Sequence, residues 1–456
     1  MAAHGVSVEK TIRALLDEKK YQTLKDILVT LEPADIAAVF EALDEERTPL
    51  LFRLLPKETA AETFAELAPE HQELLIRGFS DRELRELVNE LYVDDAADLV
   101  EEMPANVVKR ILAQADPDMR REINEILRYP ENSAGSLMTT EYVSLRPGMT
   151  VAQAIARIRS TGTDKETIYT CYVTAGRRLL GTVSVKDLLL AGDDGMPVSE
   201  IMDENVISVG TLTDQEEVAQ MLSRYNFLAL PVVDADGLMV GIVTFDDAMD
   251  VMVEEATEDI EKMAAILPSE KTYLRSNAWD LFRHRIPWLA LLMVSATFTG
   301  MIITGFESAL AAQVVLTAFI PMLMDTGGNS GSQASVTIIR ALSLGELDFA
   351  DLPRVVWKEV ETAALCGTAL SLLCFCKIML VDRLLLGNPI TLSVALVVCL
   401  TMAMTVLMAK VVGCTLPLAA KKIGFDPAVM ASPFITTIVD ALSLLVYFGI
   451  ASALLF

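Results

Sequence analysis

Apolar positions change their spacing three times along this chain of 456 residues. Over residues 31–128 they recur at helical spacing in units that repeat every 24 residues and begin "LEPADIAAVFEAL", "LPKETAAETFAEL", "FSDRELRELVNEL" and "MPANVVKRILAQA". Each unit carries Pro, Asp or Ser near its first helical position, as expected at a helix N-terminus. A repeat of this length predicts an all-helical superhelical domain.

Short β-branched runs replace the helical pattern after "YPENSAGSLMTTEYVSLRPGMTV". The segment "IYTCYVTAGRRLLGTVSVKDLLL" is echoed by "NFLALPVVDADGLMVGIVTFDDAMDVM", and each follows a helical stretch. The order helix, strand, Gly-containing turn, strand and helix resembles the CBS (cystathionine-β-synthase) module. We therefore expect two α/β halves that pack as one pseudo-symmetric unit.

Both CBS-like halves carry a glycine followed by a hydroxyl residue and an acid at the same spacing. In CBS modules that bind adenosine nucleotides, the hydroxyl and the acid sit at a helix start and hold phosphate and ribose. The simpler interpretation is a helix N-cap with an acid three residues later, and the sequence favours it. ATP binding stays open, although the first half lacks the acidic turn "DADG" of the second. The residues concerned are Gly181, Ser184 and Asp187, then Gly241, Thr244 and Asp247.

Five apolar spans follow, each near the ~20 residues that cross a bilayer. They predict an all-α membrane domain of five transmembrane helices embedded in a lipid bilayer. The approximate starts of the spans are Ile286, Ala309, Thr362, Thr391 and Pro433. The predicted domains are a helical-repeat domain at 1–130, a tandem CBS pair at 131–253, a connecting helix at 254–282 and the membrane domain at 283–456.

Charge separates these parts, although the composition of the whole chain looks contradictory. Mean hydropathy is +0.41 while the net charge is −26. Ten acidic and ten basic side chains follow residue 280, so the whole net charge lies upstream. A strongly acidic surface argues against nucleic acid as a partner. Cations are the expected partners.

Basic residues indicate the orientation of the spans. They precede the first span, lie between the second and third, and lie between the fourth and fifth, and such residues stay on the cytoplasmic side. The N-terminus also lacks the apolar core of a signal peptide. We therefore expect a multi-pass protein of the cell (inner) membrane with a cytoplasmic N-terminus and the C-terminus outside. The basic residues are Arg275, Arg283, Arg285, Arg340, Arg354, Lys358, Lys421 and Lys422.

Acidic residues form two parallel rows on the helix predicted just before the membrane domain. Like charges at this spacing cost about 0.2–0.5 kcal/mol per pair, which a solvated helix face tolerates. Clustered carboxylates also provide the hard oxygen ligands that Mg²⁺ or Ca²⁺ prefers, and we favour this cation site. The first row is Asp246, Asp250, Glu254 and Glu258, and the second is Asp247, Glu255 and Asp259.

The glycine-rich stretch "PMLMDTGGNSGSQASV" interrupts the second apolar span. Irregular backbone at membrane depth must be buried in protein or line a wet cavity, so we expect such backbone around Asn329. The alternative is that the small residues permit close helix packing.

Asp440 is the only Asp, Glu, Lys or Arg between Ala428 and Phe456. A charged side chain at a helix centre costs about 2.5–3.5 kcal/mol on insertion scales. Lys377 and Lys410 could act as partners, but both lie toward the ends of their spans. We therefore expect water and a permeating cation to compensate Asp440, because rings of acids select cations in pores. Thr436 and Thr437, which follow Pro433, add hydroxyls one turn before the acid.

At this point the sequence resembles the MgtE family of magnesium channels over essentially its whole length, with "PMLMDTGGNSGSQ" and "PFITTIVD" as the specific motifs. The resemblance implies a homodimeric Mg²⁺ channel with its pore at the two-fold axis, lined by Asn329, Thr436, Thr437 and Asp440. It also implies closure when cytosolic Mg²⁺ bridges acids of the helical domain, the CBS pair and the connecting helix. The acids that match are Asp246, Asp247, Asp250, Glu254, Glu255, Glu258 and Asp259, with Asp95 and, less specifically, Asp94 and Asp98. Some members of the family also bind ATP.

Two other classes of function stay open. In an ion-coupled divalent-cation transporter, Asp440 would carry a proton. In a membrane-anchored CBS nucleotide sensor, the apolar part would only be an anchor, which needs one span rather than five. The sequence shows no nucleophile with a base, no phosphate-binding loop and no pair of metal-binding histidines, so we do not expect an enzyme.

Overall fold

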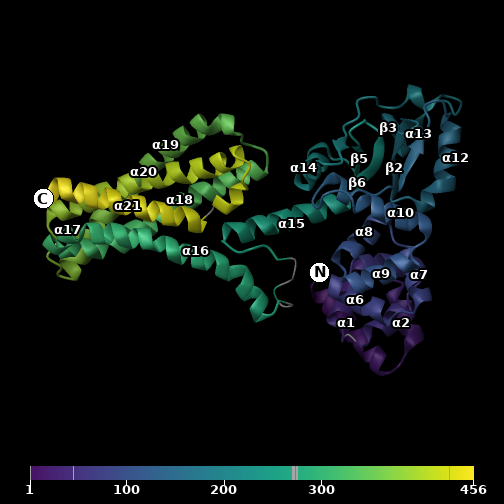
Figure 1. Cartoon of the computed structure of the whole chain (residues 1–456), viewed down its shortest axis with the longest axis horizontal. Coiled ribbons are helices and arrows are strands. Elements are labelled where there is room, and N and C mark those ends of the chain that lie inside the picture. The colour runs from purple at the N-terminus through teal and green to yellow at the C-terminus, as the bar shows by residue number, and fades with distance from the viewer. Residues whose placement is uncertain (1, 45, 270–272, 274–275, 431, 456) are drawn as a thin grey trace. The chain divides into compact units, whose positions relative to one another are not determined.

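The computed structural model describes residues 2–44, 46–269, 273, 276–430 and 432–455. It divides into two compact units, Met1–Met252 and Val253–Phe456, which are described separately (Figure 1). Arg275, one of the basic residues used to orient the first span, lies outside the described residues.

The first unit begins with a helical solenoid, as the 24-residue repeat predicts. Helices α3, α5, α7 and α9 start at Pro33, Lys57, Asp81 and Ala105, which preserves the sequence period. The helices are α1 (Ala2–Asp17), α2 (Tyr21–Leu28), α3 (Pro33–Ala42), α4 (Thr48–Phe52), α5 (Lys57–Ala65), α6 (Pro69–Gly78), α7 (Asp81–Val88), α8 (Val93–Glu102), α9 (Ala105–Gln114) and α10 (Pro117–Ile126).

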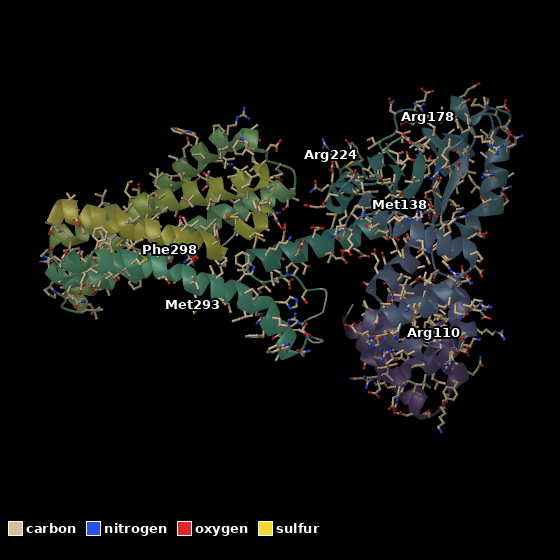
Figure 2. The ribbon with its side chains drawn as sticks, in the orientation of Figure 1. Arg110, Met138, Arg178, Arg224, Met293 and Phe298 are labelled. Carbon is tan, nitrogen blue, oxygen red and sulfur yellow. The ribbon has the colours of Figure 1, made fainter. Side chains whose placement is uncertain are left out.

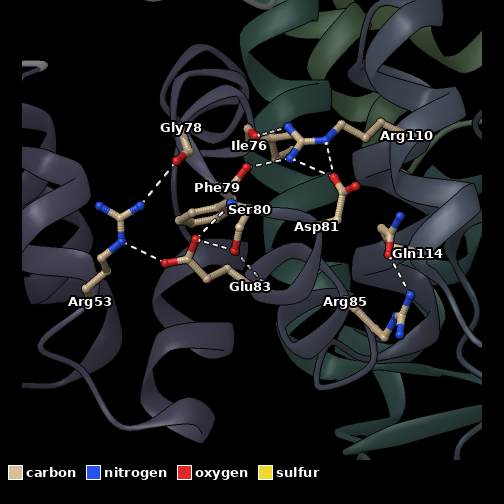
Figure 3. A network of polar contacts seen from close by, with 10 residues as sticks. All are labelled: Arg53, Ile76, Gly78, Phe79, Ser80, Asp81, Glu83, Arg85, Arg110 and Gln114. Carbon is tan, nitrogen blue, oxygen red and sulfur yellow. Dashed lines mark hydrogen bonds and ion pairs between the residues drawn. The ribbon is translucent and has the colours of Figure 1, made fainter.

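Arginines join one repeat of the solenoid to the next (Figure 3). Arg53 Nε donates to Glu83 Oε1 at 2.7 Å, and Arg110 Nε donates to Asp81 Oδ1 at 3.1 Å. Arg110 also donates to the backbone carbonyl of Phe79, where a helix has just ended. The arginines therefore satisfy carbonyl groups that the short helices leave without helical partners.

Two three-stranded sheets follow, in the order the sequence predicts. The middle strand of each sheet pairs in parallel with the first strand and antiparallel with the third. The strands are β1 (Tyr142–Leu145), β2 (Thr167–Ala175) and β3 (Arg178–Ser184), then β4 (Val209–Gly210), β5 (Ala229–Val233) and β6 (Met239–Thr244). The helices are α11 (Ala134–Leu137), α12 (Val151–Thr161), α13 (Val185–Leu190), α14 (Gln215–Tyr225) and α15 (Phe245–Met263).

Gly181 and Gly241 occupy equivalent places in the two halves. A Cβ on Gly181 would lie 2.8 Å from the carbonyl oxygen of Asp203, and one on Gly241 would lie 2.7 Å from that of Thr139. In each case the segment that leads into one half packs on the third strand of the other half. This exchange is the structural basis of the predicted pseudo-symmetric pair, and it requires glycine because the two backbones approach closely.

The connecting helix differs in extent from the predicted segment 254–282. The structure has one continuous helix, α15, that starts directly after β6 at Phe245 and ends at Met263. The next helix, α16, begins at Ala278. The acids of α15 therefore lie on the last helix of the second CBS half and its direct extension.

The second unit is helical, and four segments of its described residues are long and apolar enough to cross a membrane. They are Ala278–Gly305, Phe349–Leu385, Leu392–Lys422 and Pro427–Leu455. The helices are α16 (Ala278–Gly305), α17 (Glu307–Ala312), α18 (Ile320–Ser343), α19 (Leu352–Lys377), a π-helical extension (Ile378–Leu385), α20 (Leu392–Lys422) and α21 (Ser432–Leu455).

The predicted position of the second span was wrong. The stretch from Ala309 contains the short helix α17 and a 3₁₀ turn, Val314–Phe319, and the long helix α18 begins only at Ile320. The 24 residues of α18 extend about 36 Å, enough to cross a bilayer. Because one face of α18 is polar, it is not among the four segments selected by hydropathy.

Helix α16 presents apolar side chains outward along its length. Met293 and Phe298 are 71% and 66% exposed within the single chain (Figure 2). Such a surface suits contact with lipid or with a second copy of the chain, since monomeric soluble proteins rarely expose apolar patches of this extent.

Candidate functional site

Asp440 lies in the first half of α21 and is half-buried in the single chain. One turn earlier, the hydroxyls of Thr436 and Thr437 donate to the carbonyl oxygen of Pro433 at 2.9 and 3.0 Å. Both hydroxyls therefore bond back to the backbone of their own helix. Asp440 is left as the chemically distinctive group of this helix.

The glycine-rich stretch is a regular helix, so the expectation of irregular backbone there was wrong. A Cβ on Gly328 would lie 3.0 Å from Cγ2 of Thr436, and one on Gly331 would lie 2.8 Å from Cγ2 of Ile435. On its other side, Gly331 meets Gly413 of α20. The alternative interpretation, close packing of small residues, describes what the structure contains.

Asn329 lies on the exposed side of α18, where its Nδ2 donates to Asp325 Oδ1 at 3.1 Å. Two residues after Asp325, Gly327 packs against Val439, which precedes Asp440 in α21. Asp325 and Asp440 therefore lie next to the same contact between α18 and α21, and Asn329 follows Asp325 on the exposed side of α18. Sequence reasoning missed Asp325. Its four-residue spacing from Asn329 becomes visible once the stretch is recognised as helical.

Neither lysine considered as a partner for Asp440 pairs with it. Lys377 Nζ lies 2.8 Å from Asp382 Oδ2, and Lys410 Nζ lies 3.5 Å from Glu359 Oε2. Within the part of the chain that the structure describes, no basic side chain forms an ion pair with Asp440.

The seven acids of the two predicted rows all lie on α15, but they differ in environment. Asp246, Asp250 and Glu254 are exposed, and Glu255 is partly buried. Near the end of the helix, Glu258 pairs with Lys262 at 2.6 Å, and Asp259 accepts from Ser343 of α18 at 3.0 Å. Lys262 therefore already supplies one positive charge in this region.

Asp247 belongs to a second concentration of acids inside the first unit. Thr244 donates a short hydrogen bond to Asp247, yet burial raises the pKa of Asp247 to about 6. Burial and the charge of Asp247 raise the pKa of Asp95 on α8 to about 7. Burial raises the pKa of Asp94 well above its usual range, again with Asp247 as a contributor. Asp94, Asp95 and Asp247 are thus buried acids of the first unit, and a shared metal ion at Asp95 and Asp247 stays a prediction.

This group of acids includes two more residues, which the sequence analysis did not single out. Burial, followed by the charge of Asp247, raises the pKa of Glu166 to about 8, and burial raises the pKa of Glu141 to about 7. An oxygen of each is buried with no hydrogen-bond partner among the described residues. They lie at the starts of strands, in segments where no sequence motif marks a ligand.

The acids do not form a complete coordination sphere as they stand. Among the described residues, no three His, Cys, Asp or Glu side chains are arranged to hold one metal ion. The cluster is instead a buried concentration of carboxyl groups that resist ionisation, and a bound cation would stabilise their ionised forms.

The two hydroxyl–acid pairs of the CBS halves act as helix starts. Ser184 caps α13 in a full capping box with Asp187, in which Ser184 Oγ accepts from the backbone N–H of Asp187 at 3.0 Å. Thr244 stands directly before α15 and bonds to Asp247. For Ser184 and Asp187 this is the arrangement that the capping interpretation predicts.

Known proteins match this chain over nearly its whole length. The profile of MgtE, described as a divalent cation transporter, matches residues 320–450, the MgtE intracellular N domain matches 31–132, and the CBS domain matches 134–194 and 198–254. The magnesium transporter MgtE of Thermus thermophilus is 38% identical over 450 residues, 98% of each chain. That of Bacillus subtilis is 33% identical over 440 residues, 96% of this chain and 95% of the relative.

Two solved structures resemble the first half of the chain. The cytosolic domain of the Mg²⁺ channel MgtE in complex with ATP has a TM-score of 0.51 and 40% identity, and covers 53% of this chain and 99% of that domain. The soluble part of a magnesium transporter has a TM-score of 0.52 and 30% identity, and covers 55% and 99%.

Proposed function

The chain belongs to the MgtE family of magnesium transporters, and from this premise we propose that it is a Mg²⁺-selective channel for passive influx. It is a multi-pass membrane protein with an intracellular N-terminal domain, and the family is one of transporters rather than enzymes. In the proposed arrangement the C-terminus faces outside, and two copies of the chain place their α21 helices at a two-fold axis.

The observation that carries this proposal is the environment of Asp440. It is an acid in an apolar helix with no basic partner among the described residues, and Val439 before it packs against Gly327 of α18, the helix that carries Asp325 and Asn329. Mg²⁺ gives up its water reluctantly and is often held through its hydration shell by one or two carboxylates. Asp440 from two copies would supply two carboxylates, with Thr436, Thr437 and Asn329 lining the path.

Closure by cytosolic Mg²⁺ is the second part of the proposal. Buried acids repel one another in the first unit, and a divalent cation would draw their elements together. The acids of α15 would couple this event to the membrane unit, because α15 runs through both. The proposed ligands are Asp95, Asp246, Asp247, Asp250, Glu254, Glu255, Glu258 and Asp259.

ATP is a second proposed ligand of the CBS pair. It is favoured by the similarity to a cytosolic domain that was crystallised with ATP. Ser184 with Asp187 and Thr244 with Asp247 are the groups proposed to meet its phosphates and ribose. The capping bonds do not preclude this role, since a hydroxyl at a helix start points toward the same donors that bind phosphate.

Mg²⁺ flux into proteoliposomes tests the channel, with the membrane potential and the pH gradient set independently. The wild-type flux follows the electrochemical gradient of Mg²⁺ and ignores the pH gradient. Asp440→Asn reduces flux or loses selectivity, while Glu361→Gln, which removes an exposed acid of α19, leaves both unchanged. Flux that requires a proton or sodium gradient would instead identify a coupled transporter. Ion flux that is absent from both proteins would favour the anchored nucleotide sensor.

Closure is tested in the same vesicles by varying the internal Mg²⁺. Rising internal Mg²⁺ lowers the wild-type flux, and Asp247→Asn shifts this inhibition to higher internal concentrations. An unchanged inhibition curve would remove Asp247 from the regulatory site without affecting the proposed pore.

A further inference from the structure

Helix α18 carries a polar stripe on its exposed side. Asp325, Asn329, Gln333 and Thr337 follow one another at four-residue spacing, and all four are exposed in the single chain; we call them the α18 stripe. The opposite side of the helix is buried and contains glycines, small residues and aliphatic side chains. The stripe therefore runs along α18 on the side away from its packing contacts.

Hydrocarbon is a poor environment for this stripe. A carboxylate and two amides facing lipid tails would each lose hydrogen bonds to water without replacement. Two internal bonds are present: Asn329 donates to Asp325 at 3.1 Å, and Thr337 Oγ1 donates to the carbonyl of Gln333 at 2.8 Å. These bonds leave carboxylate and amide oxygens open to water, so the stripe belongs on a wetted surface inside the protein assembly.

The packing of α18 on α21 places Asp325 relative to Asp440. The helices run in opposite directions, because Gly327 lies against Ser443 while Gly331 lies against Ile435. Asp325 precedes Gly327, so it lies toward the C-terminal end of α21. With the C-terminus of α21 outside, Asp325 stands on the outer side of Asp440.

We propose that Asp325 is a second acid of the ion path, held in position by Asn329, which gathers hydrated Mg²⁺ on the outer side of Asp440. This inference rests on the proposed channel function and adds a residue to it. The Asn329 amide donates to one carboxylate oxygen and fixes its direction, which leaves the other oxygen for the water of the path. An acid in this place raises the local cation concentration before the ion reaches Asp440.

The test measures Mg²⁺ flux into proteoliposomes over a range of external Mg²⁺ for wild type, Asp325→Asn, Asp325→Glu and Asp440→Asn. Glu307→Gln is the matched control, because it removes another exposed acid on the same proposed side of the membrane, outside the stripe. We expect Asp325→Asn to raise the half-saturating external Mg²⁺ by roughly three- to tenfold. Asp325→Glu restores most of this loss, and Glu307→Gln has no effect. The change shrinks as external salt screens the charge.

The outcomes separate this inference from the function on which it rests. If Asp325→Asn and Asp325→Glu both saturate like wild type while Asp440→Asn is impaired, Asp325 has no place in the path and the channel stands. An equal effect of Glu307→Gln would mean that only general surface charge matters. If Asp440→Asn also behaves as wild type, the proposed pore itself fails. Should Asp325→Asn fail to fold, Asp325→Ser takes its place, and a saturation curve equal to that of wild type overturns the inference.

Discussion

The ammonium of Lys262 lies 2.6 Å from the carboxylate of Asp426, and it lies equally close to Glu258. The contact joins the end of α15 to the segment that leads into α21. A side-chain cation thus occupies a place among acids for which the proposed function invokes Mg²⁺. Part of the negative charge at the end of α15 is neutralised without any bound metal.

Replacing Lys262 should make this region depend on divalent cations. In Lys262→Met, Glu258 and Asp426 lose their shared positive partner, and a charge-assisted hydrogen bond is worth about 1.5–3 kcal/mol. In EDTA, amide hydrogen exchange of residues 253–263 should become at least about tenfold faster, and millimolar Mg²⁺ should restore much of the protection. Lys358→Met, at an exposed position of α19, serves as control. Equal exchange in all three proteins would show that the contact has no structural effect.

Gly413→Ala should separate α20 from α18. The added Cβ would come 2.3 Å from the carbonyl oxygen of Gly331, a backbone atom that cannot move aside cheaply. Overpacking of this kind costs about 1–3 kcal/mol. Tryptophan fluorescence during heating in detergent reports this unit selectively, because Trp279, Trp288 and Trp357 all belong to it.

The control for that experiment is Gly300→Ala in α16, where an added Cβ meets nothing within 4 Å. Its thermal midpoint should match or slightly exceed that of wild type, because alanine is the better helix former. A Gly413→Ala protein as stable as Gly300→Ala would contradict the close contact.

Removal of one partner from the ion pair of Lys410 and Glu359 should strongly lower the free energy of unfolding. Both side chains are nearly buried, with 7% and 15% exposure. Lys410→Met leaves the Glu359 carboxylate buried without its partner, which destabilises by about 3–5 kcal/mol. Lys410→Met combined with Glu359→Gln should recover more than half of that loss, as measured by the same tryptophan signal. Additive losses in the double variant would indicate that the two groups do not interact.

The first unit should lose stability as pH rises in the absence of divalent cations. The folded state raises the pKa of Glu166 to about 8, so it keeps a proton that the unfolded chain has already released above its ordinary value near 4.3. This contribution is present at low pH and is lost as pH rises through about 8. Hydrogen exchange of β2, corrected for the intrinsic rate, should show at least about tenfold less protection at pH 8 than at pH 5 in EDTA.

Glu166→Gln should flatten this dependence, because glutamine has no proton to release. Glu200→Gln, at an exposed site of the same half, should retain the full slope. A slope that is identical in wild type and Glu166→Gln would mean that other groups dominate the titration.

Much of the fold was predictable because repeated patterns reinforce one another. The solenoid period and the CBS order each appear more than once, and every repetition supports the same assignment. The boundary of α15 was less accessible, since an acidic helix that continues past a domain gives no stop signal before Met263. The apolar spans were recognised by their mean hydropathy. This quantity averages over all faces of a helix and hides a single polar face.

The residues of the membrane site were predicted only in part. Asp440 stands out because its surroundings are uniformly apolar. Asp325 does not stand out, since glycine, asparagine and serine follow it and suggested an interrupted backbone. Only the glycine contacts of α18 with α20 and α21 explain why such a sequence is helical. Glu141 and Glu166 depend on tertiary burial, which no local pattern records.

The two faces of α18 also bear on how the protein is made. A helix whose exposed side carries Asp325, Asn329 and Gln333 gains little from entering lipid by itself. The glycine face that would compensate it is covered by α20 and α21, which are synthesised later. Stable placement of α18 in the bilayer therefore depends on helices that follow it in the chain, and its assembly is a folding step rather than a simple partition into the bilayer.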